Sequence, residues 1–305
     1  MNMKERFKEM NMNKIICWWS GGVTSAVACK VAIDLYGIEN CRVIMIDTKN
    51  EDVDSYRFLK DCEKWYGTTI ERITGIGDKY KTIQDVWRKN KSLNVASGAI
   101  CSSELKRRVR EDWQKDNSFE HQVFGFEFDS REFKRAYGMT NNNPSVKPIY
   151  PLMMMGYNKE DCIEILTQAE IEIPRMYTLG FRNNNCFQTG CVQGGIGYWK
   201  KMQKEFPHKF EAMAKMEHEL TDSKGEPVTM LKDQSSEAKI KVAESGLNWK
   251  GFIFLKKHPN YPDVITIDDK KGRAVKPLFE CNGFCGTNDL AGRVGTEQEI
   301  NFNPS

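Results

Sequence analysis

Two adjacent glycines flanked by serine and threonine form the first segment of the chain whose residue types suit a functional site. Residues 20–25 read Ser-Gly-Gly-Val-Thr-Ser. The apolar run 15–19 before them has the length and β-branched start of a buried strand, and a helix-compatible segment after them stops at Gly37. A strand, a glycine turn and a helix aim backbone N–H groups and the positive helix end at one point. The segment therefore predicts an anion site, usually for phosphate, although it lacks the spacing and lysine of the common nucleotide P-loop.

Four cysteines in two close pairs form a second candidate site. Cys186 and Cys191 have the form Cys-x4-Cys, Cys281 and Cys285 have the form Cys-x3-Cys, and both pairs lie among glycines and asparagines. Thiolates about one turn apart can converge on one metal. All-sulfur ligation suits zinc or an iron–sulfur cluster, and four thiols without metal are the plain alternative. Cys101 could be a ligand, a redox thiol or a structural residue.

A basic helical segment follows Cys101. In CSSELKRRVREDW, the residues Leu105, Val109 and Trp113 recur at four-residue spacing and form an apolar stripe. The remaining faces carry Lys106, Arg107, Arg108 and Arg110. The plain interpretation of these cations is a solvated basic face, and we adopt it for Arg110.

Alternating strands and helices are expected to position these residues. Strand-like runs cover residues 15–19, 41–47, 68–74 and 121–128, and helical stretches cover 25–36, 53–66, 80–90 and 102–115. This alternation predicts an α/β fold with a doubly wound, mostly parallel sheet and helices on both faces. Ligands of such sheets bind at the carboxyl ends of the strands, where residues 20–25, Asp47 and residues 127–131 would meet.

The pattern changes after residue 140. A loop rich in proline and asparagine is followed by a helix that starts near Asn158, a plausible N-cap, and by a second helix over 196–219. Residues 221–248 are polar and predict a surface excursion, and residues 263–281 predict a β-hairpin. We therefore expect a nucleotide-binding domain at 13–150, a helical cysteine-containing extension at 151–220, and a C-terminal region at 221–305 that carries the hairpin and the Cys281 and Cys285 loop.

The bulk composition describes an ordinary globular chain. The 305 residues are 40% hydrophobic and 29% charged, and the formal charge of +3 is too small to argue for nucleic acid by itself. Residues 1–12 are charged and methionine-rich, unlike a secretory signal, and no apolar run approaches the length needed to cross a bilayer. With ten cysteines and no such signal, a cytoplasmic protein without a membrane partner is expected, and metal binding is favoured over a disulfide framework.

Three motifs, taken in order, resemble one known family. WWSGGVTSAV resembles the PP-loop of the adenine nucleotide α-hydrolase superfamily, and CSSELKRR resembles the Cys-Thr-x-x-Leu-Lys segment of its phosphoadenosine-phosphosulfate (PAPS) reductase-like branch. Residues 147–186, from KPIYPL to GFRNNNC, resemble the later signature of that branch. The resemblance covers roughly residues 13–215.

The resemblance implies a site for ATP, or a related adenine nucleotide, with Mg²⁺. It assigns the phosphates to Ser20, Gly21, Gly22, Val23, Thr24 and Ser25, a ribose or magnesium contact to Asp47, and phosphate or sulfate contacts to Lys106, Arg107 and Arg131. Several relatives carry a [4Fe–4S] cluster beside the nucleotide, which favours iron–sulfur over Zn²⁺ at the four paired cysteines.

The expected activity is that of an ATP pyrophosphatase. Such an enzyme cuts between the α and β phosphates and adenylates an acceptor, here a nucleic acid or a small molecule awaiting sulfur from a donor protein. One alternative is a sulfonucleotide reductase with Cys281 or Cys285 as nucleophile, although the chain lacks the Cys-Cys pair and the Glu-Cys-Gly-Leu-His tail of those enzymes. Another is a non-catalytic nucleotide-binding module.

Overall fold

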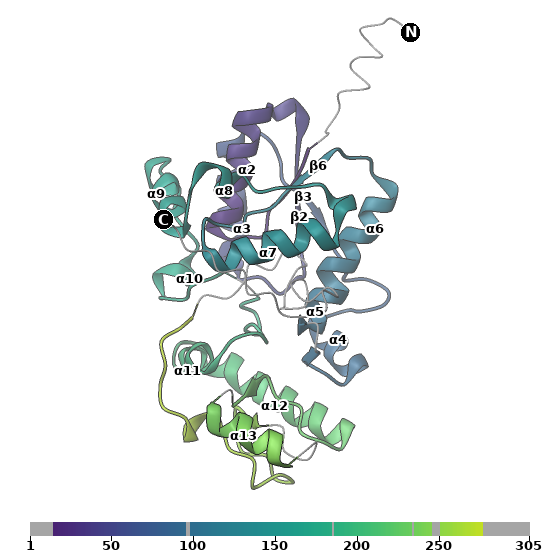
Figure 1. Cartoon of the computed structure of the whole chain (residues 1–305), viewed down its shortest axis with the longest axis vertical. Helices are drawn as coiled ribbons and strands as arrows, with labels where there is room; N and C mark the ends of the chain where they lie inside the picture. The colour runs from purple at the N-terminus through teal and green to yellow at the C-terminus, as the bar shows by residue number, and fades with distance from the viewer. Residues whose placement is uncertain (1–14, 96–97, 185, 234, 246–250, 277–305) are drawn as a thin grey trace, which may run out of the picture.

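A five-stranded parallel sheet organises the computed structural model, which describes residues 15–95, 98–184, 186–233, 235–245 and 251–276 (Figure 1). Its strands are β1 (Ile15–Trp18), β2 (Cys41–Ile46), β3 (Glu71–Ile73), β6 (His121–Val123) and β7 (Pro148–Ile149). They lie in the order β3-β2-β1-β6-β7, and every pairing is parallel. The chain runs outward from β1 through β2 to β3 and then returns to β6, on the other side of β1. The connections that follow β1 and β6 therefore lead in opposite directions along the sheet. The predicted doubly wound sheet is confirmed, with its switch point between β1 and β6.

Helices cover both faces of this sheet. Alternate residues of the first strand run, Ile15, Cys17 and Trp19, pack with helices α2 (Val23–Tyr36), α3 (Val53–Tyr66) and α9 (Lys159–Gln168). Ile16 and Trp18 point to the opposite face, where α6 (Arg108–Asp116) and α7 (Ser130–Asn142) lie. A strand buried on both faces must be apolar throughout, which explains the unbroken run in the sequence.

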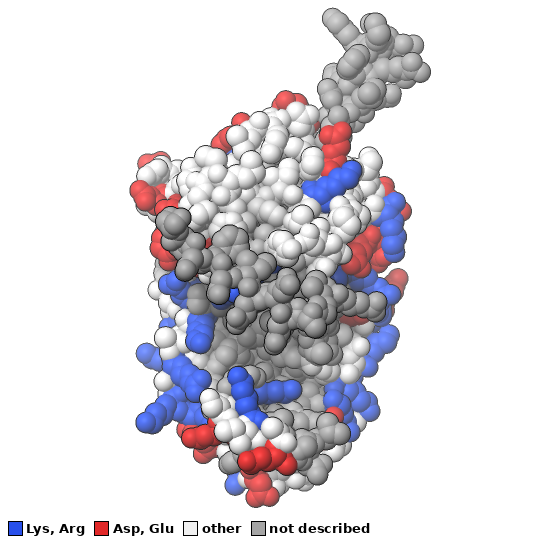
Figure 2. Space-filling model, viewed as in Figure 1, with Lys and Arg blue, Asp and Glu red and all other residues white. Residues whose placement is uncertain are grey.

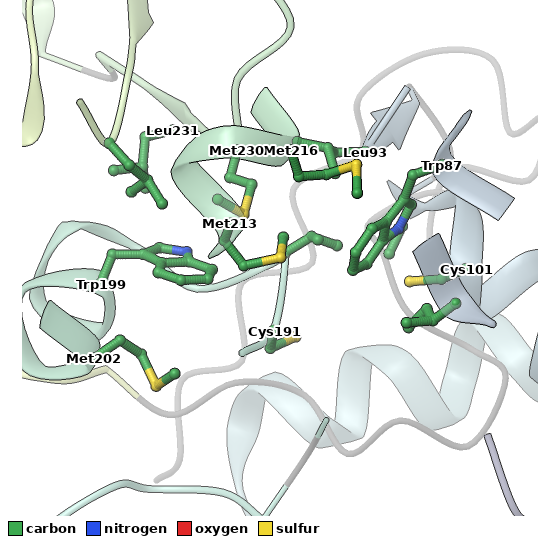
Figure 3. Close-up of a cluster of buried hydrophobic side chains, with 14 of the residues drawn as sticks. Trp87, Leu93, Cys101, Cys191, Trp199, Met202, Met213, Met216, Met230 and Leu231 are labelled. Carbon is green, nitrogen blue, oxygen red and sulfur yellow. The ribbon is translucent and has the colours of Figure 1, made fainter. Parts of the chain in front are cut away.

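A second core lies below the sheet in Figure 1. It is built from α4 (Ile83–Asn90), α5 (Ile100–Ser102), α11 (Ile196–Glu205), α12 (Pro207–Lys224) and the antiparallel pair β8 (Leu231–Lys232) and β9 (Phe252–Ile253). Its centre is rich in sulfur and indole, and the labelled side chains converge in Figure 3: Trp87, Trp199, Met202, Met213, Met216 and Met230, with Cys101 and Cys191. Methionine side chains are flexible and polarizable and therefore pack well in an irregular core of this kind.

Shorter elements connect these layers. They are η1 (Ile38–Asn40), β4 (Asn94–Val95), β5 (Gly98–Ala99), the π-helical turn η2 (Ser103–Arg107), η3 (Pro144–Val146), α8 (Pro151–Met155), α10 (Arg175–Thr178), α13 (Ser236–Ser245) and η4 (Ile267–Asp269). Within the described ranges, no helix combines the length and hydropathy that a membrane-spanning segment requires.

Three local expectations after residue 195 are wrong. The helix expected over 196–219 is two helices, because Pro207 cannot continue the helix before it and instead starts α12. The hairpin expected over 263–281 is absent from its described part, 263–276, where Thr266 and Asp269 cap the 3₁₀ turn η4. The expected surface excursion at 221–248 contains the buried residues Val228, Met230, Leu231 and Ala238.

Candidate nucleotide site

Two serines hold the glycine loop in place. Ser25 Oγ accepts hydrogen bonds from the backbone N and the Oγ of Ser20, at 3.0 and 2.9 Å, and donates to the carbonyl of Gly22 at 2.9 Å. Gly21 has a φ of +89°, a conformation that favours glycine. The hydroxyls at both ends of residues 20–25 therefore fix the path of the loop.

Helix α2 begins at this loop without a side-chain cap from its N-cap residue, although the backbone N of Val23 donates to Oη of Tyr177 at 3.4 Å. Its N-cap is Gly22, and its first turn contains no acidic residue. By contrast, Asp52 caps α3, Asp129 caps α7 and Asn158 caps α9. The first N–H groups of a helix need partners, and the positive helix end favours an anion. The uncapped helix that faces the switch point is therefore the one suited to bind a phosphate.

The strand next to β1 ends directly against the loop. A Cβ added at Gly125, two residues after β6, would lie 2.6 Å from Cα and 2.7 Å from N of Ser25. Only glycine allows this approach of two backbones. Sequence reasoning missed Gly125, although a lone glycine inside the aromatic run FGFEF was a usable signal.

Asp47 lies at the end of β2, as expected, with its carboxylate engaged by nearby residues. It accepts hydrogen bonds from N and Nζ of Lys49, at 2.8 and 2.9 Å, and from Oη of Tyr56 at 3.0 Å. Burial acts to raise the pKa of Asp47, but the bonds from Lys49 and Tyr56 outweigh it and lower the pKa. Asp47 therefore stays ionised.

Lys106 reaches the same strand end from the basic segment. It is buried, and its Nζ lies 3.6 Å from Oε1 of Glu51, which also accepts a hydrogen bond from Thr48. Arg107 adjoins Lys106 in the π-helical turn, and Arg131 lies in the first turn of α7. Arg110 was expected on a solvated face, but it is only 2% exposed, so that expectation is wrong.

The first cysteine pair lies in a loop that docks on the segment after β2. Asn50 Nδ2 donates to Thr189 Oγ1 at 2.8 Å and to the carbonyl of Cys186 at 3.5 Å, and Gln188 N donates to the carbonyl of Asn50 at 3.0 Å. The backbone N of Cys186 donates to Oε2 of Glu51 at 3.3 Å. The structure thus brings the cysteine loop, defined as residues 186–191, beside Glu51 and Lys106.

The predicted metal site is described only in part. Cys186 and Cys191 are buried in the cysteine loop, whereas Cys281 and Cys285 lie outside the described residues. Across the described ranges, no group of three or more His, Cys, Asp or Glu side chains could hold a metal. The described half of the site can therefore supply two thiolates, and a metal there needs ligands from beyond these ranges.

Two buried polar atoms beside the glycine loop have no hydrogen-bond partner within the described part of the chain. They are Oγ1 of Thr24, in the first turn of α2, and Oδ1 of Asn184, whose amide nitrogen donates to the carbonyl of Gly21 at 2.9 Å. Unsatisfied buried groups are rare in native proteins and often mark a site that awaits a water, an ion or a ligand. The loop therefore has hydrogen-bonding capacity left for a bound group.

The chain is similar to known proteins in fold and, distantly, in sequence. No protein-family model matches the chain. An uncharacterized protein of Methanocaldococcus jannaschii is 24% identical over 200 residues, which cover 63% of this chain and only 39% of that relative. The crystal structure of a PAPS reductase from Candida auris, in a phosphate complex, is similar in fold, with a TM-score of 0.43 and 14% identity over 60% of this chain and 86% of that one. Neither match assigns an activity to this chain.

Proposed function

We propose that this protein is an ATP pyrophosphatase that binds an adenine nucleotide on residues 20–25 and adenylates an acceptor. The observation that carries the proposal is the uncapped start of α2, held open by the Ser20–Ser25 hydrogen bonds at the switch point of the sheet. The resemblance of the three motifs to PP-loop enzymes supports the choice of an adenine nucleotide.

The residues of the site divide the chemistry among them. The amides of residues 21–25 bind phosphate oxygens, and Lys106 supplies a positive charge where a pyrophosphate leaving group gains negative charge. Glu51 holds the lysine ammonium in place across 3.6 Å. Arg107 and Arg131 neutralise further phosphate charge, and ionised Asp47 is the oxygen ligand that a nucleotide-bound Mg²⁺ would use. Mg²⁺ supplies charge neutralisation on the phosphates when bound.

The acceptor that we propose is a nucleic acid. After adenylation, sulfur from a donor protein displaces the activated oxygen, which leaves with AMP. Lys and Arg side chains gather on the lower half of the face shown in Figure 2, over the second core. Exposed cations of that region include Lys204, Lys257, Lys271 and Arg273. Such a surface suits a polyanion, whose binding then weakens with salt.

A metal centre at the cysteine pairs is part of the same proposal. Cys186 and Cys191 would hold it together with Cys281 and Cys285, as a [4Fe–4S] cluster or as Zn²⁺, and it would supply a sulfur-handling or structural centre. Anaerobic absorption spectroscopy with metal analysis tests this directly. Broad absorption at about 400 nm with iron indicates the cluster, and stoichiometric zinc in a colourless protein indicates zinc. A protein that contains neither iron nor zinc would contradict this part of the proposal.

The decisive experiment measures pyrophosphate and AMP released from Mg·ATP, with and without RNA or DNA. The double variant Ser20→Ala, Ser25→Ala removes the hydrogen bonds within the loop and should abolish release. Gly77→Ala is a matched control, because a Cβ there has nothing within 4 Å. Full activity of the double variant would contradict the proposal.

Two further measurements separate the other candidate activities. Sulfite release from adenosine 5′-phosphosulfate or its 3′-phosphorylated form, with a thioredoxin donor, would identify a sulfonucleotide reductase instead. Tight ATP binding without turnover under any acceptor condition would identify a non-catalytic module.

A further inference from the structure

We propose that Asn184 is a positioning residue that sets the conformation of the glycine loop and couples it to the cysteine loop. The ligand of the glycine loop is the adenine nucleotide of the proposed function, on which this part of the inference rests. The coupling itself is a property of the hydrogen bonds described below.

Asn184 joins the glycine loop to helix α3. Its side chain is 1% exposed, and its Nδ2 donates to the carbonyl of Gly21 and to Oγ of Ser55, both at 2.9 Å. An amide nitrogen has two hydrogens, so both are used. Gly21 is the residue with the left-handed backbone, and its carbonyl orientation decides where the following amides point. Asn184 therefore fixes the part of the loop with the most conformational freedom.

The chain reaches the cysteine loop two residues later. The backbone N of Cys186 donates to Glu51, the carboxylate that holds Lys106, and the carbonyl of Cys186 accepts from Asn50. Cys186 has a φ of +54°, which is unusual for a residue with a side chain, so its position depends on these contacts. A shift of Cys186 would therefore move Asn184 on one side and Glu51 on the other.

This arrangement links two sites thermodynamically. Anything that orders the cysteine loop, such as a metal on Cys186 and Cys191, also orders Gly21 and thereby favours nucleotide binding. By reciprocity, a bound nucleotide strengthens the ordering of the cysteine loop by the same factor, which for protein sites is about 5- to 150-fold. Asn184 thus makes nucleotide affinity sensitive to the state of the cysteine loop.

The test uses three alanine variants of asparagines whose side chains donate to a backbone carbonyl. Asn184→Ala removes the hydrogen bond to the carbonyl of Gly21, and Asn50→Ala removes the one to the carbonyl of Cys186 in the cysteine loop. Asn90→Ala removes a bond to the carbonyl of Val86 within α4, away from the site. Two quantities are measured: hydrogen exchange of the amides at 21–25 in nucleotide-free protein, and the Kd for ATP. We expect Asn184→Ala to raise both by about tenfold or more, since a buried carbonyl loses its partner. Asn90→Ala should change neither.

A double-variant cycle tests the coupling. Asn50→Ala should weaken ATP binding through the cysteine loop, and this effect should disappear when Asn184 is already alanine. Full additivity of the two effects would overturn the coupling. Should Asn184→Ala fail to fold, Ser55→Ala removes only the second acceptor of Asn184 and should give a smaller increase in exchange.

The outcomes distinguish this inference from the proposed function. If the wild-type protein binds no adenine nucleotide but Asn184→Ala still raises exchange at 21–25, the proposed function fails and the positioning role stands. If neither exchange nor Kd changes in a folded Asn184→Ala protein, the positioning role is overturned while nucleotide binding remains.

Discussion

The sheet and the second core position their residues in different ways. The sheet presents polar groups at the ends of long-range parallel strands, where Gly125 touches Ser25 and Asp47 follows β2. Within the described residues, the strands of the second core are two residues long, and a buried carboxyl group on a helix binds the backbone next to them. Glu217 of α12 is fully buried and accepts hydrogen bonds from the backbone N of Met230 at 2.8 Å and of Leu255 at 2.7 Å.

Because of this difference, we expect substitutions in the two regions to affect different properties, namely ligand binding for the sheet and stability for the second core. Close backbone packing sets the glycine loop, so a single methyl group there should affect the ligand site. Large methionine and tryptophan side chains build the second core, so truncating one of them should lower the free energy of unfolding. Four predictions test the contrast.

The largest effect is expected in the second core. Trp199→Ala removes a fully buried indole that packs on Tyr198 and Phe210, and should lower the free energy of unfolding by about 3–5 kcal/mol. Chemical denaturation measures it. A loss below about 1 kcal/mol would show that this core is not tightly packed.

Gly125→Ala should act chiefly on the nucleotide. The new Cβ would push the loop away from β6, which costs about 1–3 kcal/mol of stability and disturbs the amides that bind phosphate. We expect a loss of ATP affinity far larger than that of the control Gly77→Ala, as measured by calorimetry. Equal affinities of the two variants would remove Gly125 from the site.

Glu217 should make stability depend on pH. Burial raises its pKa from 4.5 to about 8, while bonds from Leu255 and Met230 lower it in part. Because the folded pKa is the higher one, the stability from this group is fully present below pH 4.5 and is lost as pH rises through 8. The free energy of unfolding should therefore fall between pH 5 and 8, as denaturation at several pH values would measure.

The matched variant isolates this carboxyl group. Glu217→Gln mimics the protonated acid, so the contribution of this side chain to the free energy of unfolding should not change between pH 5 and 8. The variant should therefore gain stability relative to the wild type as pH rises. Parallel pH profiles of the two proteins would contradict the assignment.

The smallest effect is expected at a helix cap far from the site. Thr82 and Asp85 form a capping box at the start of α4, and Thr82→Ala should cost about 1 kcal/mol without changing ATP affinity. Thr24→Ala, in the uncapped α2, should show the reverse: weaker binding of ATP and little loss of stability. Thermal unfolding and calorimetry on both variants measure the contrast.

Local signals in the sequence predicted much of the fold. The apolar run before the glycines is β1, the helix expected over 53–66 is α3, and Asn158 caps α9 through a capping box with Asp161. Each depends on residues within a few positions of one another. Pro207 was also a local signal, and its neglect led to one long helix in place of two.

Short-range patterns predicted the alternation of strands and helices and the glycine loop, because periodicity, caps and turns act between near neighbours, and residue type alone identified the candidate cysteines. Only the tertiary structure decided that Asn184 contacts Gly21 across 163 positions, that Arg110 is buried and that Gly125 lies against Ser25. Such contacts depend on how the strands are ordered in the sheet and which loops then meet at its edge, and nothing in the spacing of these residues along the chain encodes that.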